Sequence, residues 1–216
     1  MTSVIMTECS GLWRRTLLIE SDGSHDTSTG VAWLQGITAY VDTRGFAGRL
    51  GQHGDVFEWQ RLIDIEPPGP FPDAGRMRWE ARVLIEVGAH ADYVEHWVRQ
   101  DGPAEPCWAL FASKAILLRV GAQFGWADRS GVVLDAIGGP LWAALNPHVD
   151  GSDLVANGGR WSIEDSEGDV DLWVAQRHSR RCRTSTSAGC VRRTWRSASG
   201  WRARSARRPT RSGSST

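Results

Sequence analysis

Apolar and polar residues alternate one by one along most of the chain before residue 170, and this period of two limits the fold more than any other feature. The clearest case is RMRWEARVLIEV at 76–87, in which Met77, Trp79 and Ile85 lie in phase with mostly charged residues between them. A helix would scatter these apolar residues around its circumference, whereas a strand places them on one face. The run therefore predicts a half-buried strand over 76–87.

The same alternation recurs in further segments that are bounded by residues favouring turns. These segments are LWRRTLLIE at 12–20, GVAWLQGITAYVDTR at 30–44, DVFEWQRLIDI at 55–65, DYVEHWVRQ at 92–100, CWALFA at 107–112, KAILLRVGAQFGW at 114–126, GRWSIE at 159–164 and DVDLWVA at 169–175. In the segment at 55–65, we expect Phe57, Trp59, Ile63 and Ile65 to share one face. Such a series of short strands is typical of an all-β protein.

The order of these strands favours an all-β, antiparallel, lipocalin-like up-and-down barrel of about eight or more strands over a sandwich. The connections are short, and closure of a barrel removes the unpaired strand edges. Only 132–146 looks partly helical, and its Gly-Gly-Pro sequence interrupts the pattern. Ten of the twelve tryptophans lie before residue 177, spread along the strands, so the simplest interpretation is that they fill the barrel interior or its ends.

Charge divides the chain into two parts. All 25 acidic residues lie at or before Asp171, whereas 12 of the 25 basic residues lie in 177–216. Residues 1–176 thus hold 13 basic and 25 acidic residues, a net charge of −12, which repels phosphate backbones. We expect a barrel domain over 10–176 and a basic tail over 177–216, and only the tail offers affinity for nucleic acid.

The tail at 177–216 contains 12 arginines and 9 serines, and its only large apolar residues are Val191, Trp195 and Trp201. This composition cannot offset the entropy cost of folding, so we expect disorder. One interpretation is a genuine basic arm for nucleic acid or acidic surfaces, including the acidic body itself. The favoured alternative is out-of-frame translation of GC-rich DNA, in which case the barrel is incomplete at its C-terminal end.

Gly11 and Trp13 stand at the entry to the first expected strand, in the Gly-x-Trp spacing that begins lipocalin-type barrels. With LWRRTLLIE, FEWQRLIDIEPP, MRWEARVLIEVG and YVEHWVRQ, they make the chain over 10–127 similar to a poorly characterised lipocalin-like family of bacteria. That family has a two-domain, casein-kinase-interacting relative in fungi. The resemblance implies a calycin-type barrel whose narrow end is closed by the tryptophan under a basic side chain of the last strand. It implies no catalytic residues.

Arg61 is the main candidate for ligand binding, because a polar residue on an apolar face needs an internal partner or a ligand. It lies in phase with Trp59, where its guanidinium can hold a ligand carboxylate in bidentate fashion. Alternatively, it pairs with an internal carboxylate such as Glu80 or Glu95, or its head lies in water. The tryptophans expected to line a cavity are Trp33, Trp59 and Trp79.

Two further polar positions are candidates for the same pocket. His96 is either a pH-dependent pocket donor or a structural residue, and Gln35 lies on the second expected strand. On the opposite face of that segment, Tyr40, Asp42 and Arg44 alternate at a period of two. They form either a polar mouth or an outward ion pair, and the ion pair is favoured.

No catalytic signature is present in the sequence: it has no nucleophile elbow, phosphate loop, dinucleotide fingerprint or zinc-protease motif. We expect no catalytic residues, no cofactor and no metal. The opening apolar run is too short for a signal peptide and no run approaches a membrane span, so we expect a cytoplasmic location. The predicted function is non-catalytic binding of a small, largely apolar ligand, with or without a carboxylate. The alternatives are a protein-interaction module of unknown partner and an enzyme on the same barrel.

Overall fold

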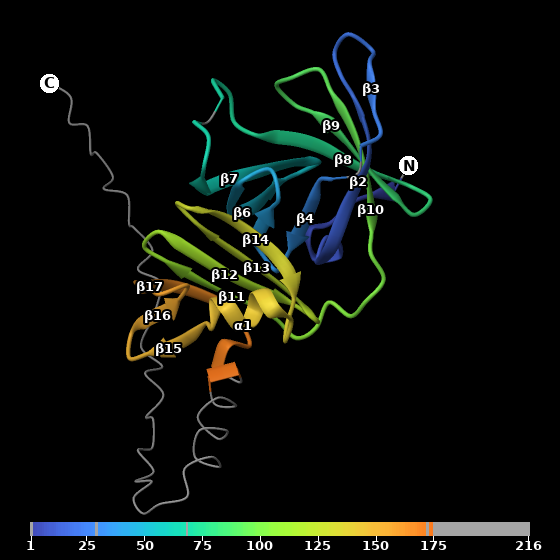
Figure 1. Cartoon of the computed structure of the whole chain (residues 1–216). Helices are drawn as coiled ribbons and strands as arrows, with labels where there is room; N and C mark the ends of the chain where they lie inside the picture. Colours follow the sequence, from blue (N-terminus) through green and yellow to red (C-terminus); the bar gives the residue numbers. More distant parts are fainter. Residues whose placement is uncertain (1, 29, 68, 172, 175–216) are drawn as a thin grey trace, which may run out of the picture.

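The structure is a computed structural model that describes residues 2–28, 30–67, 69–171, 173 and 174. These residues form two antiparallel sheets, one closed and one open, that lie against each other (Figure 1). The basic tail at 177–216, with both of its interpretations, lies outside the described residues. No helix among the described residues is long and apolar enough to cross a membrane.

The first sheet closes into a barrel of eight strands, which confirms the expected fold class. Its strands are β2 (Gly11–Ile19), β4 (Ala32–Gln35), β5 (Ala39–Asp42), β6 (Phe46–His53), β7 (Val56–Asp64), β8 (Ala74–Glu80), β9 (Val83–Gly88) and β10 (Val94–Arg99). Each strand pairs with the next, and β10 pairs with β2 to close the ring. Two short strands, β1 (Thr2–Ser3) and β3 (His25–Asp26), add to β8 and β2, and a single 3-10 turn, η1 (Met6–Glu8), precedes β2.

The second sheet has seven strands and stays open. It consists of β11 (Cys107–Ala112), β12 (Ala115–Val120), β13 (Gln123–Asp128), β14 (Gly131–Ala136), β15 (His148–Asp150), β16 (Asp153–Ala156) and β17 (Gly159–Gly168). β17 pairs with β11, so β14 and β15 are the two edges, and helix α1 (Pro140–Leu145) lies in the connection between them. The expected single barrel over 10–176 is therefore a barrel that closes by Arg99, followed by a separate sheet.

The run at 76–87 forms two strands rather than the single strand that its alternation predicts. Glu80 pairs with Val83 across a two-residue turn, and Ala81 adopts a left-handed φ of 54° there. After the turn the inward phase changes, so that Leu84 and Glu86 face the barrel interior. The turn contains no Gly, Pro, Asn or Asp, so the usual sequence signal of a hairpin is missing.

A β-bulge between β6 and β7 changes the face of the residues at the end of β7. Ala47 pairs with Ile63 but Gly48 pairs with Arg61, so β7 has one extra residue at this point. A Cβ at Gly48 would lie 1.9 Å from the Gln60 carbonyl oxygen, which only glycine avoids. The expectation that Ile63 shares a face with Phe57 and Trp59 is wrong, because the bulge turns Ile63 outward.

Five of the ten tryptophans that were expected in the barrel fill its interior, and the other five pack in the core of the second sheet. Trp33 lies at the centre, with ring centroids 5.7 Å from those of Trp13 and Trp97 and 5.9 Å from that of Trp59. Trp79 packs against Trp13 at 5.9 Å. The interior of the barrel is thus a solid aromatic core over most of its length.

The two sheets pack through their outer faces. Leu34, Val41 and Ile63 of the barrel contact Phe111 and Leu118 of the second sheet in one apolar cluster. β4, β5 and β11 are buried on both faces, because one face of each lies in the core of its own sheet and the other lies in the junction between the sheets.

Candidate functional site

A pocket of about 510 Å³ opens at the end of the barrel where β7 ends and β8 begins. Its walls come from β7, from the proline-rich segment before β8 and from the β9–β10 connection. Among its lining residues are Trp59, Arg61, Phe71, Asp73, His90 and Tyr93. The proline-rich segment forms this wall because its prolines lack the amide hydrogens of a sheet and prevent β7 from running directly into β8.

Arg61 lines the pocket, but its guanidinium already has partners. Its Nε and Nη2 donate to Oδ2 of Asp73 at 3.2 and 2.7 Å, and its Nη1 donates to Oδ2 of Asp64 at 3.0 Å. The guanidinium also lies 3.8 Å from the centre of the Phe46 ring. The internal pairing considered for Arg61 is therefore present, with Asp64 and Asp73 in place of Glu80 or Glu95.

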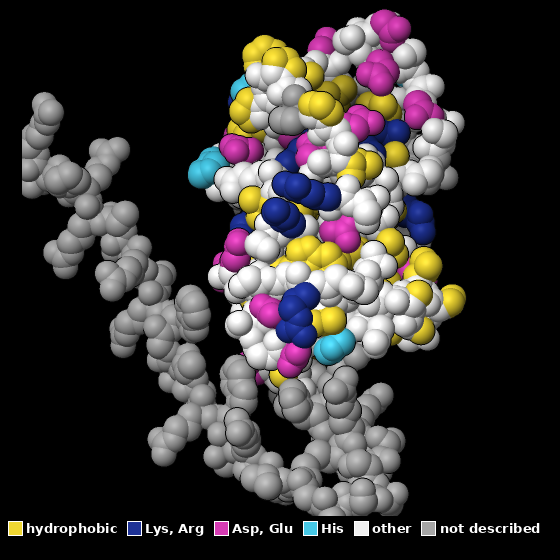
Figure 2. Space-filling view, turned by 60° about the vertical axis from the view of Figure 1, so that its left-hand side comes forward, with side chains coloured by type: hydrophobic (Ala, Val, Ile, Leu, Met, Phe, Trp, Pro, Cys, Tyr) yellow, Lys and Arg dark blue, Asp and Glu magenta, His cyan; other side chains and the backbone are white. Residues whose placement is uncertain are grey.

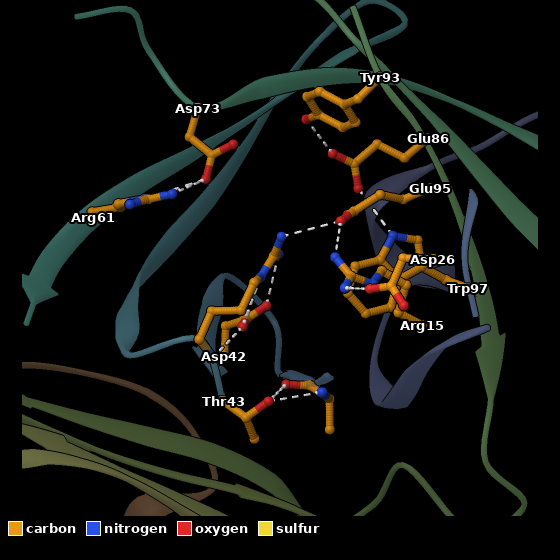
Figure 3. Close-up of polar contacts among 12 residues, drawn as sticks. Arg15, Asp26, Asp42, Thr43, Arg61, Asp73, Glu86, Tyr93, Glu95 and Trp97 are labelled. Carbon is orange, nitrogen blue, oxygen red and sulfur yellow. Dashed lines mark hydrogen bonds and ion pairs between the residues drawn. The ribbon is translucent and has the colours of Figure 1, made fainter. Parts of the chain in front are cut away.

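Two further arginines lie at the same end of the barrel, around the buried carboxylate of Glu95 (Figure 3). Arg15 donates to Glu95 at 2.8 Å and to Asp26 at 3.3 Å. Arg44 donates to Glu95 at 3.2 Å and to both oxygens of Asp42. Burying these charges is tolerated because each arginine bridges two carboxylates.

Glu86 is another buried carboxyl group of this end, and the groups that donate hydrogen bonds to it are neutral. It is 3% exposed, and it accepts hydrogen bonds from the Tyr93 hydroxyl at 2.8 Å and from the Trp97 indole at 3.1 Å. Burial, and then the nearby charge of Glu95, raise the pKa of Glu86 to about 8. Tyr93 also lines the pocket, so its hydroxyl connects the pocket wall to this carboxyl group (Figure 3).

The cluster contains more acidic than basic groups. Its members are three arginines, Arg15, Arg44 and Arg61, and six carboxyl groups, Asp26, Asp42, Asp64, Asp73, Glu86 and Glu95. With Glu86 protonated, five negative charges face three positive charges, a net charge of −2. This end of the barrel therefore carries a negative field in a partly desolvated setting.

The Tyr40 hydroxyl lies near this cluster and has no hydrogen-bond partner among the described residues, although Tyr40 is fully buried. Burial, followed by the charge of Asp73, raises the pKa of its hydroxyl. The nearby Arg61 acts in the opposite direction. Tyr40 is not among the residues that line the pocket, so its unpartnered hydroxyl is a feature of the core beside the cluster.

The structure brings two of the six residues predicted to bind a ligand to the pocket, Arg61 and Trp59. Trp33 and Gln35 lie in the interior, where the Trp33 indole donates to the Gln35 side chain at 3.1 Å. Trp79 packs in the same core.

His96 lies on β10 between Glu95 and Trp97, which point inward, so its side chain takes the opposite face. It is not among the residues that line the pocket. The structure therefore separates His96 from the candidate site.

Gly11 and Trp13 lie at the opposite end of the barrel from the pocket. Trp13 is fully buried, and its indole donates to the Cys9 carbonyl oxygen at 2.6 Å. The side chain of Arg99 from β10 lies against Gly11, so close that a Cβ there would lie 2.5 Å from Arg99 Nε. Because Gly11 also has a φ of +148°, any other residue would be strained. These residues close one end of the barrel.

The Asp42–Arg44 ion pair exists, but the expectation that it points outward is wrong. Asp42 is 1% exposed and stands opposite Trp33 in the β4–β5 pair. Opposed residues on neighbouring antiparallel strands lie on the same face, so Asp42 and Trp33 both point into the barrel.

Sequence reasoning did not identify Glu86, Asp73 or Arg15 as members of the site. The missed turn at Ala81 reversed the apparent phase of Glu86. Asp73 lies in a segment without regular structure, and Arg15 is 80 residues from its partner Glu95. The one signal available in the sequence was the presence of charged residues in alternating strands. Charged residues that face outward give the same pattern.

No group of three or more His, Cys, Asp or Glu side chains among the described residues is placed to hold a metal ion. Comparisons with protein-family models, with curated proteins and with solved structures found no match to the chain.

Proposed function

We propose that the protein binds a small molecule in the pocket at the mouth of its barrel, without chemical conversion of the ligand. The observation that carries the proposal is the pocket of about 510 Å³, whose walls combine aromatic rings with a small number of polar groups. This combination is typical of small-molecule sites, in which apolar walls supply contact area and polar groups set orientation.

The aromatic core limits where the ligand lies. Trp33 packs against Trp59 and is part of the floor beneath the site, whereas Trp79 packs against Trp13 toward the opposite end of the barrel. A ligand would contact Trp59, Phe71 and Tyr93 near the surface. A carboxylate held by Arg61 is not part of the proposal, because that ligand group would compete with Asp73 for the same nitrogens.

The test blocks the pocket with one substitution. Ala91 is an exposed residue of the pocket wall, and Ala91→Trp adds an indole there without entering the core. The matched control is Ala122→Trp, on an exposed turn of the second sheet. Binding of 2-naphthylmethylamine, 2-naphthalenemethanol and 2-naphthoate is measured by titration calorimetry.

We expect at least one of these probes to bind, with an affinity about tenfold lower in Ala91→Trp and unchanged in Ala122→Trp. The proposal fails if no probe binds, or if the pocket variant binds as well as the control. The two alternative functions, a protein-interaction module and an enzyme on the same barrel, stay predictions.

A further inference from the structure

We infer that the ligand of this pocket is cationic: a primary or secondary amine attached to an apolar or aromatic group. This inference rests on the proposed function and adds the chemical class of the ligand. It follows from the excess of carboxylates over arginines, from the acceptor oxygen that remains on Asp73, and from the aromatic rings around the opening.

The charges at this end of the barrel favour a cation over an anion. Every arginine of the cluster already bridges two carboxylates. The one buried guanidinium nitrogen without a hydrogen-bond partner among the described residues, Nε of Arg15, belongs to a residue that does not line the pocket. A positive charge in the pocket would instead reduce the excess of negative charge. Over the face in Figure 2, acidic and basic side chains are interspersed, with no large patch of a single sign.

Asp73 has one carboxylate oxygen available for an ammonium group. Both hydrogen bonds from Arg61 reach its Oδ2, and its Oδ1 accepts none from a described side chain. The Asp73 side chain is 25% exposed and lines the pocket, so a ligand can reach it. An N–H donor on the ligand can make a charge-assisted hydrogen bond there, whereas a ligand carboxylate would be repelled.

The aromatic residues around the opening can also stabilise a positive charge. Phe71 is 65% exposed and stacks on the His90 ring at 6.2 Å, and Trp59 and Tyr93 line the same pocket. Aromatic faces attract ammonium groups because of the negative potential over the ring. The rings would hold the apolar part of the ligand as well.

The three naphthyl probes test the charge of the ligand, because they share one ring system and differ in their polar group. At pH 7, calorimetry on the full chain should give an affinity for 2-naphthylmethylamine about tenfold higher than for the alcohol. The affinity for 2-naphthoate should be lower than for the alcohol. Equal or tighter binding of 2-naphthoate, lost in Ala91→Trp, overturns the cationic class while the binding function survives. Absence of binding by all three probes overturns both.

Asp73→Asn tests the assigned contact, with Asp55→Asn as its control. Asp55 is exposed and forms an exposed ion pair with Arg76. We expect Asp73→Asn to weaken amine binding about tenfold with little effect on the alcohol, and Asp55→Asn to change neither.

Phe71→Ala is a second variant, at a highly exposed position that tolerates truncation. It should lower the affinity for 2-naphthylmethylamine about threefold or more. Leu141→Ala, an exposed apolar residue of α1, is its control. Amine binding that is unchanged in both Asp73→Asn and Phe71→Ala overturns the assignment.

Discussion

The barrel holds some of its ion pairs in its interior, whereas those within the second sheet lie on its surface. Arg15 and Glu95 meet in the barrel with side chains 9% and 4% exposed. In the described part of the second sheet, the internal ion pairs are those of Arg160 with Asp150 and Asp153, and Arg160 is 53% exposed. One sheet therefore holds charges in its interior, and the other is held together by apolar contacts on both faces.

The difference follows from closure. A closed ring of eight strands has an interior that its side chains must fill, and at the pocket end most of the buried polar groups satisfy one another's hydrogen bonds. The open sheet instead buries one face on the barrel and covers the other with α1 and aromatic pairs. Trp108 lies 4.6 Å from Trp173, and Trp126 lies 5.0 Å from Trp161. Closure of the barrel thus creates an enclosed interior in which a polar cluster can lie, whereas an open sheet has no such interior.

Loss of a buried arginine should have the largest effect. Arg15→Met removes a partner of the buried Glu95 carboxylate and should lower the free energy of unfolding by about 4 kcal/mol. Arg119 of the second sheet is the matched control, because it donates to a backbone carbonyl oxygen rather than to a carboxylate. Arg119→Met should cost about 1 kcal/mol or less. Urea unfolding measures both, and similar losses would remove the contrast between the sheets.

Enlarging a side chain at the contact between the two sheets should have the next largest effect on the free energy of unfolding. A Cβ at Gly125 would lie 2.8 Å from the Cβ of Val41, so Gly125→Val forces the two outer faces apart. We expect a loss of about 3 kcal/mol in the free energy of unfolding. Gly30→Val is the control, because nothing lies within 4 Å of the added carbon. If Gly125→Val and Gly30→Val have the same free energy of unfolding, the packed junction between the sheets contributes less to stability than its apolar contacts indicate.

The pH dependence of stability sharpens the same comparison, with a smaller effect. The raised pKa of Glu86 means that the folded chain keeps a proton that the unfolded chain releases near 4.5. The stability from protonated Glu86 is therefore complete below about 4.5 and is lost as the pH rises through about 8.

Between pH 5.5 and 7, wild type should lose about 2 kcal/mol more than Glu86→Gln, whose amide does not ionise and can accept from the Trp97 indole while donating to the Tyr93 hydroxyl oxygen. Thermal melts across this range measure the difference. Parallel pH profiles for the two proteins would show that Glu86 is ionised in the folded state.

Local patterns predicted the strands well where the inward and outward faces differ in polarity. Trp13 and Trp33 were expected in the core, and both are fully or almost fully buried. The same patterns did not predict the turn at Ala81 or the bulge at Gly48, because neither position carries an unambiguous local signal. Each changes the phase of the residues that follow, which is why Ile85 and Ile63 were assigned to the wrong face.

The sequence by itself determined an all-β protein with a tryptophan-filled interior, because the period of side chains along a strand is a local property. It also identified Arg61 as a polar residue in need of partners. Only the tertiary structure decided that the ring closes by Arg99 and that Asp73 holds Arg61. It also decided that Glu95 meets Arg15 across 80 residues. Those contacts depend on which strands become neighbours, and the balance of charge at the pocket depends on them in turn.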